Sequence, residues 1–408
     1  MLLNIVRPQM IKKFKRIISP VLLRQYSLNT CLMTFFILAG VVLQARASAS
    51  TAVSSSNFSQ ISSSSVSILT AAAATASKIK PFYKWTPLML AAWNGNKTKV
   101  RELSLTPKAV NEKDEDGRTA LTYAAWNGHS AVVQILLKKG ARINDKDKFG
   151  HTALTRAILS GYVDTSKLLV SRRANVNIKD INDLTPLMWS AIEGRANIIP
   201  ILLSAGAKIN AVDKNGMSAL MLACKGSHTS TTWKLLKSGA NPNTKNKQKR
   251  SALWYASTNG NNNIVTLLIS QNANVSIQDN TGQTPLMRAA VNNHSSIVEL
   301  LLRANAKVDI KSESGNTALQ LAAANGHVKI VKMLYNAGSN VNNQNKVGST
   351  AMMTAIERGQ VNAVKFLLDT NAKMSLKNNT GDTAFDIAKA NNDPKILNAM
   401  KSGSGLKF

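Results

Sequence analysis

The chain has 408 residues, enough for several ordinary domains or for one long array of repeats. Its formal net charge is +30, from 51 basic and 21 acidic residues, a property that bears on partners and solubility but not on fold. Lysines outnumber arginines by 36 to 15, which argues against specific nucleic-acid recognition, since arginine is the usual reader of bases and phosphates. The only cysteines, Cys31 and Cys224, exclude a disulfide framework and a cysteine-pair metal site.

The first 47 residues have the features of an export signal. Residues 1–30 carry basic but no acidic side chains, an apolar run follows at 31–43, and Ala45-Arg46-Ala47 fits a small-x-small cleavage site. The apolar run is short for a membrane span, which needs roughly 20 residues. We therefore expect residues 1–47 to be a signal peptide and the protein to be exported, either periplasmic or secreted.

Two alternatives stay open for this segment. If it is not cleaved, residues 31–44 would anchor the protein in a membrane, and this is the only route by which we expect a membrane contact. The basic region is long for a signal peptide, although Met10 could be the true start, and acid-free, Ser-rich leaders are also typical of mitochondrial transit peptides. Residues 48–80 are rich in Ser and Ala, and we predict a flexible linker there.

From Trp85 onward the chain repeats with a period of 33 residues. A Thr or Ser is followed by Pro or Ala, usually by Leu, then by paired small residues such as Ala91-Ala92 and by a Gly such as Gly95. The hydroxyl residue recurs at Thr86, Thr119, Thr152, Thr185, Ser218, Ser251, Thr284, Thr317, Thr350 and Thr383. We predict a repeat domain over 81–408, with units that start near 85, 118, 151, 184, 217, 250, 283, 316, 349 and 382.

Each recurring residue type suits a helix pair. The Thr or Ser can cap a first helix, and a Pro such as Pro87 is tolerated at the next position because its missing N–H has no partner there. The Gly can end that helix in a left-handed conformation. Pairs such as Val132-Val133 and Leu136-Leu137 form one apolar stripe on a second helix. The Asn/Asp/Gly/Lys segments between units have turn chemistry.

The period and the motif T-P-L-x-x-A-A together resemble the ankyrin repeat, and the resemblance covers Trp85 to about Met400. It implies an all-α solenoid of stacked helix-loop-helix units with short β-hairpin loops. One unit cannot bury its stripe alone, so stacking builds the core. The first unit departs from the pattern at 104–110, where we predict a shorter second helix. The family also implies that hairpin tips and first helices line a concave binding face.

No residue pattern indicates catalysis, a cofactor or a metal site, and we expect a protein that is not an enzyme. Four histidines, each ten residues after the hydroxyl residue, are expected to be structural: His129, His228, His294 and His327. His151 and the acidic residues Asp114 and Asp147 fall in predicted turns, where we expect them to be solvated. Cys224 replaces a paired alanine and should be a small buried apolar residue.

Two groups of residues are candidates for partner contacts. The aromatic surface comprises Trp85, Trp93, Tyr123, Trp126, Phe149, Leu159 and Ile192. An exposed apolar and aromatic patch is typical of an interface, although the tryptophans could instead stack on one another as N-terminal packing. The basic patch comprises Lys225, Lys245, Lys247, Lys249 and Arg250, within a stretch (214–278) that contains no acidic residue.

These groups favour a monomeric scaffold that binds a protein partner on its concave face. The alternatives are an electrostatic binder of nucleic acid or of an anionic membrane or envelope through the basic patch, or a secreted effector directed at a host. A solvated basic loop and an acidic protein partner are also compatible with the basic patch.

Overall fold

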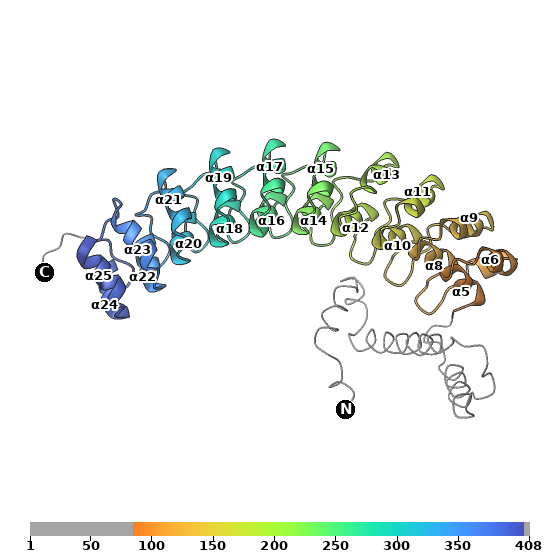
Figure 1. Ribbon diagram of the computed structural model, residues 1–408, viewed down its shortest axis with the longest axis horizontal. Coiled ribbons are helices and arrows are strands. Elements are labelled where there is room, and N and C mark those ends of the chain that lie inside the picture. Colours follow the sequence, from red (N-terminus) through yellow and green to blue (C-terminus); the bar gives the residue numbers. More distant parts are fainter. Residues whose placement is uncertain (1–84, 404–408) are drawn as a thin grey trace, which may run out of the picture. The chain divides into compact units, whose positions relative to one another are not determined.

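The computed structural model describes residues 85–403 (Figure 1). The predicted signal or anchor at 1–47 and the predicted linker at 48–80 lie outside the described residues, so both stay predictions. The described chain consists of helix pairs that follow one another in sequence order.

The first helices of the ten units follow the predicted hydroxyl residues. They are α5 (Pro87–Trp93), α8 (Ala120–Trp126), α10 (Ala153–Ser160), α12 (Pro186–Ile192), α14 (Ala219–Lys225), α16 (Ala252–Asn259), α18 (Pro285–Val291), α20 (Ala318–Ala324), α22 (Ala351–Glu357) and α24 (Ala384–Asn391). The second helices are α6 (Lys97–Leu103), α9 (Ser130–Lys138), α11 (Val163–Ser171), α13 (Ile199–Ser204), α15 (Thr229–Lys237), α17 (Asn262–Ser270), α19 (Ser295–Arg303), α21 (Val328–Asn336), α23 (Val361–Leu368) and α25 (Pro394–Gly403).

The first unit differs as its sequence predicts. Its second helix, α6, has 7 residues where α9 has 9, and an additional short helix, α7 (Pro107–Val110), follows it. Thr106 caps α7 by accepting a hydrogen bond from the N–H of Ala109 at 3.2 Å. The second helix of this unit is therefore shorter and is followed, after a break, by the separate helix α7.

Neighbouring first helices pack side by side, from α5 on α8 to α22 on α24, and neighbouring second helices form a parallel row. Figure 1 shows that the row of units curves, with the first helices and the turns on its inner side and the second helices on its outer side. We call these two sides the inner face and the outer face. The arrangement places residues of successive units, 33 positions apart, next to one another.

The predicted helix signals have their expected geometry. Every hydroxyl residue from Thr86 to Thr383 caps its helix by accepting a hydrogen bond from the backbone N–H three residues later. Gly161 and Gly260 end α10 and α16 with φ of 83° and 78°, and Ser227 and Asn293 adopt positive φ where other units have glycine. The sequence therefore specifies the boundaries of the first helices locally.

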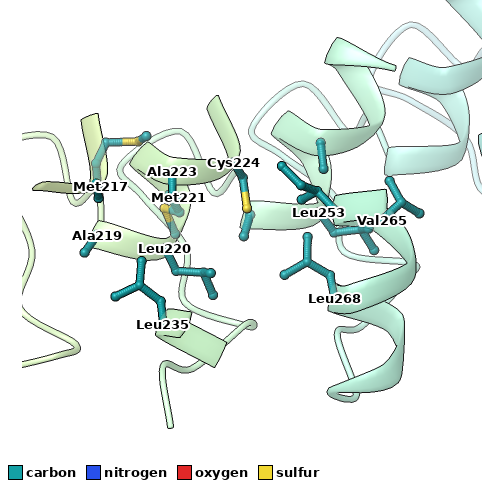
Figure 2. Packing of buried hydrophobic residues seen from close by; sticks show 14 of the residues in the cluster. Met217, Ala219, Leu220, Met221, Ala223, Cys224, Leu235, Leu253, Val265 and Leu268 are labelled. Atoms are coloured by element: carbon teal, nitrogen blue, oxygen red, sulfur yellow. The ribbon is translucent and has the colours of Figure 1, made fainter. Parts of the chain in front are cut away.

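The core runs between the two rows of helices. Figure 2 shows Leu220 and Cys224 of α14 packed among apolar side chains that include Leu235 and Leu253. The paired alanines are buried and let adjacent first helices approach closely. Cys224 is fully buried as expected, and burial raises the pKa of its thiol to about 12, so it is not a reactive nucleophile.

The hairpin loops contain less β structure than we expected. Across residues 85–403, antiparallel pairing is limited to single bridges between Val212 and Ser218 and between Lys377 and Thr383. The turns are instead joined to one another by backbone hydrogen bonds, such as the N–H of Lys148 to the carbonyl of Asp116 at 2.8 Å. Tight turns with side-chain hydrogen bonds replace strand pairing within each loop.

Candidate partner-binding surface

Each turn on the inner face is organised by a polar residue five positions before the capping Thr or Ser. In the second unit, Asp114 Oδ1 accepts the backbone N–H groups of Asp116 and Arg118 at 2.9 and 2.8 Å. The same pair of bonds forms at Asp147, Asp180, Asp213, Asn246, Asp279, Asn345 and Asn378. Our expectation that Asp114 and Asp147 are solvated is therefore wrong, because each is buried by the turn that it holds.

In the second to fourth units, the second oxygen of this aspartate binds the first helix of the same unit. Asp114 accepts the hydroxyl of Tyr123, and Asp180 accepts the indole N–H of Trp189 at 3.0 Å. Burial and the bond to Asp114 raise the pKa of Tyr123, which keeps the phenol protonated. The turn and the first helix are thus joined through a buried polar contact.

The third unit contains a buried ion pair at this place. Arg156 is 1% exposed, and its Nε donates to Asp147 Oδ2 at 3.1 Å. A buried guanidinium is tolerated only beside such a carboxylate. Its sequence signal is an acidic residue followed nine positions later by a basic residue, as at Asp147 and Arg156.

His151 is buried rather than solvated, which corrects our expectation. It is 5% exposed; its Nδ1 lies 3.8 Å from Asp147 Oδ2 and its Nε2 lies 3.6 Å from Asp180 Oδ2. Burial alone would raise the pKa of Asp180, but hydrogen bonds from His151, from two backbone N–H groups and from Trp189 outweigh it and hold that pKa below its ordinary value. The imidazole therefore bridges the turns of the third and fourth units.

The aromatic residues of the first two units form one cluster. Ring centroids lie 5.5 Å apart for Trp85 and Trp93, 4.5 Å for Trp85 and Tyr123, and 5.9 Å for Trp93 and Trp126. These separations are those of favourable edge-to-face and offset aromatic pairs. Two guanidinium groups lie over the Trp126 ring, with Arg156 at 4.4 Å and Arg118 at 5.3 Å from its centroid.

The residues of the aromatic surface differ in what they leave exposed. Tyr123 and Leu159 are buried, at 1% and 9% exposure, so they support the surface from below. The side chains of Trp85, Trp93, Trp126, Phe149 and Ile192 are half-buried. Because the tryptophans contact one another as well as solvent, they both pack the N-terminal units and offer surface on the inner face.

The basic patch has two parts. Lys225 at the end of α14 and Lys245, Lys247 and Lys249 in the next turn are exposed. Arg250 is different, because its guanidinium lies 4.2 Å from the centroid of the Trp254 ring and its Nε is 3.4 Å from Asp279 Oδ2. The lysines are therefore available to a partner, whereas Arg250 belongs to a structured contact.

Trp233 is an exposed aromatic residue outside the predicted aromatic surface. It lies on α15 at the outer face, is 46% exposed, and borders a groove that Leu267 of α17 also lines. The signal was present in the repeat: fifteen residues after the hydroxyl residue, other units have polar residues or proline, as at Gln134, Lys167 and Pro200. The fold therefore does not require an aromatic residue there.

A family model for ankyrin repeats matches successive segments that together span residues 59–405, with the first at 59–147 and the last at 319–405. The chain belongs to the ankyrin-repeat family. A search of curated proteins gave no match. Ankyrin repeats are generally scaffolds for protein–protein interaction, and proteins built from them are typically not catalysts.

The four recurring histidines, His129, His228, His294 and His327, are structural, as expected. The Nε2 of His129 lies 2.9 Å from the carbonyl oxygen of Trp93, and the Nε2 of His228 lies 2.8 Å from that of Ile192. Gly95 must lack a side chain here, because a Cβ would lie 2.7 Å from the His129 ring. Within residues 85–403, no group of His, Cys, Asp and Glu could hold a metal ion, and no helix is long and apolar enough to cross a membrane.

Proposed function

We propose that this protein is an exported, monomeric ankyrin-repeat scaffold that binds a protein partner on its inner face, through the aromatic surface. The observation that carries the proposal is the cluster of half-buried tryptophans, Trp85, Trp93 and Trp126, on the inner face. Half-buried tryptophans held by their neighbours are typical of binding hot spots. A scaffold that is already ordered loses little conformational entropy when it binds.

The ankyrin framework does not explain these tryptophans. Positions equivalent to Trp93 and Trp126 hold Lys225, Thr258 and Glu357 in later units, and those units form the same helices. An aromatic residue at this position is therefore optional for folding. Selection for a contact at the inner face would account for its presence in two successive units.

Replacing Trp93 and Trp126 together by leucine is expected to weaken partner binding at least tenfold, because the rings supply the large apolar contact. Leucine is chosen over alanine because Leu159 occupies the equivalent position of the third unit, so the helices accept it. The partner recovered by affinity capture with the natural protein would be titrated against both forms, and circular dichroism would verify the fold.

The matched control changes Lys245, Lys247 and Lys249 to glutamine, which should leave this affinity within about twofold if exposed charges contribute little. The opposite pattern, with binding lost on lysine neutralisation and kept in the tryptophan variant, would contradict the proposal. It would favour the alternative, an electrostatic binder of nucleic acid or of an anionic envelope.

The alternative rests on the exposed lysines and on the absence of acidic residues from 214 to 278. The dependence of binding affinity on salt concentration distinguishes the two functions. Affinity for a polyanion falls steeply as the logarithm of salt concentration rises, because bound cations are released, whereas a contact made by aromatic rings changes little. The lysine-rich composition again argues against sequence-specific reading of nucleic acid.

Export is part of the proposal and has its own test. The basic region, the apolar run and Ala45-Arg46-Ala47 support a cleaved signal, after which the mature chain would begin at Ser48. N-terminal sequencing of the protein from its source cells is expected to give Ser48. An N-terminus upstream of the apolar run would instead mean a retained anchor, and cleavage within a mitochondrial fraction would mean a transit peptide.

A further inference from the structure

The chain contains the same arrangement of two arginines and one aspartate twice. Arg118, Asp147 and Arg156 occupy the second and third units, and Arg250, Asp279 and Arg288 occupy the same repeat positions in the sixth and seventh units. A tryptophan of the earlier unit contacts both arginines in each case, although from different repeat positions: Trp126 in the first arrangement and Trp254 in the second. The two arrangements can therefore be compared directly.

The ion pairs of the two arrangements differ. In the first, Arg156 pairs with Asp147, and Arg118 pairs with Asp116 of its own turn at 3.0 Å. Position 248, which corresponds to Asp116, is a glutamine. Arg250 therefore has no acidic residue in its own turn, and its Nε lies 3.4 Å from Asp279 Oδ2 instead. Asp279 holds the position of Asp147, so it is the carboxylate with which Arg288 would pair if it followed Arg156.

Arg288 is left with neutral acceptors. Its Nη1 donates to Gln283 Oε1 at 3.1 Å, and its Nε donates to Thr258 Oγ1 at 3.4 Å. Among residues 85–403, Arg288 makes no ion pair with a carboxylate. Burial and the nearby positive charge of Arg250 lower the pKa of the half-buried Arg288 guanidinium. The negative charge of Asp279 acts in the opposite direction and is outweighed.

This part of the inner face is thus short of one carboxylate. Asp279 Oδ2 lies 3.4 Å from Arg250 Nε, and Asp279 acts on Arg288 only through its nearby charge. Residues 214–278 contain no acidic residue. Thr258, which contacts Arg288, belongs to α16 at the position where Trp93 and Trp126 stand in the first two units. Taken by themselves, Arg250, Arg288 and Asp279 carry an excess of one positive charge, which one carboxylate of a partner would balance.

We propose that Arg288, together with Arg250, binds the carboxylate of an Asp or Glu side chain in a protein segment that lies along the inner face at the sixth and seventh units. The inference rests on the proposed function in that the partner occupies the inner face. The planar guanidinium of Arg288 can donate two parallel hydrogen bonds to the carboxylate, and Arg250 supplies the second charge. Trp254 holds both guanidinium groups in place beneath the bound carboxylate.

The test uses the full chain and a synthetic peptide of alternating Glu and Gly as the probe, so that it does not depend on the partner of the aromatic surface. Titration calorimetry is expected to show that Arg288→Leu weakens peptide binding about tenfold. The fold accepts leucine at this position, since Leu90, Leu222 and Leu321 occupy it in other units. Arg303→Leu is the control, because it removes one arginine from α19 that is exposed and paired with Glu299.

A second variant tests the missing carboxylate itself. Gln248→Asp restores the residue that Asp116 provides in the first arrangement, so Arg250 should turn to it and release Asp279 to Arg288. Peptide affinity is then expected to fall about as far as in Arg288→Leu. Gln271→Asp changes the net charge equally at an exposed position after α17 and should have little effect.

Several results would overturn the proposal. One is that the natural chain fails to bind the Glu/Gly peptide, or binds a Gln/Gly peptide equally well. Another is that Arg288→Leu or Gln248→Asp binds the Glu/Gly peptide with full affinity. Finally, the natural chain could prefer inorganic phosphate to the peptide, with that preference lost in Arg288→Leu. The last result would assign the site to a phosphate group. The tryptophan-to-leucine variant separates the two proposals, because it should lose the captured partner and keep the peptide.

Discussion

Asp147→Ala is expected to lower the free energy of unfolding by about 3–5 kcal/mol, as is usual when one member of a buried ion pair is removed. The substitution leaves the buried guanidinium of Arg156 without its carboxylate. It also removes the acceptor for the backbone N–H groups of Phe149 and His151. Urea unfolding followed by circular dichroism would measure the loss.

Asp213→Ala is the matched control, because Asp213 holds the same position in the fifth unit. It accepts the N–H groups of Asn215 and Met217 but is half-buried and makes no ion pair with the described residues. We expect a loss of about 1–2 kcal/mol, the value of two ordinary hydrogen bonds. Equal losses in the two variants would mean that the pair of Asp147 and Arg156 contributes nothing beyond the turn.

Gly150→Ala should be the other strongly destabilising change, by about 2–5 kcal/mol. Gly150 has φ of +80°, where an L-residue is strained by roughly 1–2 kcal/mol. A Cβ would also lie 2.7 Å from the Cα of Asp180, and the backbone of the next turn cannot move away cheaply. Overpacking adds roughly 1–3 kcal/mol. Thermal unfolding of the variant would measure the sum.

Gly140→Ala separates the two contributions. Gly140 has φ of +85°, but its Cβ would meet nothing within 4 Å, so the strain acts alone and should cost about 1–2 kcal/mol. If both variants lose the same stability, close contact between successive turns does not limit position 150, and the stacking of turns is looser than the structure indicates.

Much of the fold was predictable because its signals are local and recur. A capping hydroxyl such as Thr86, a left-handed glycine such as Gly161 and the buried pair Val132-Val133 each act within one unit, and the period of 33 repeats them. Ten weak signals in one register make a strong prediction. The loops were predicted less well, since whether a turn pairs as strands or is held by a side chain such as Asp114 depends on geometry that the spacing does not encode.

The candidate site was predictable in its residue types and only partly in its geometry. Trp93 and Trp126 stood out because the repeat does not need them, and the structure brings them together with Trp85. Their burial could not be predicted, because it depends on how far each ring turns toward its neighbours. His151 was placed in solvent for the same reason: its position in a turn does not reveal that the turns of adjacent units enclose it.

The sequence by itself determined the helices, their order and their stacking, because those depend on caps, glycines and apolar stripes that recur in every unit. Only the tertiary structure decided which charges pair. Arg156 and Arg288 occupy the same position with an aspartate nine residues before them, yet only Arg156 is paired with it. The outcome depends on the preceding unit, where Asp116 or Gln248 decides which carboxylate the other arginine takes. Competition between side chains of adjacent units is a property of the stacked array, and no single unit contains it.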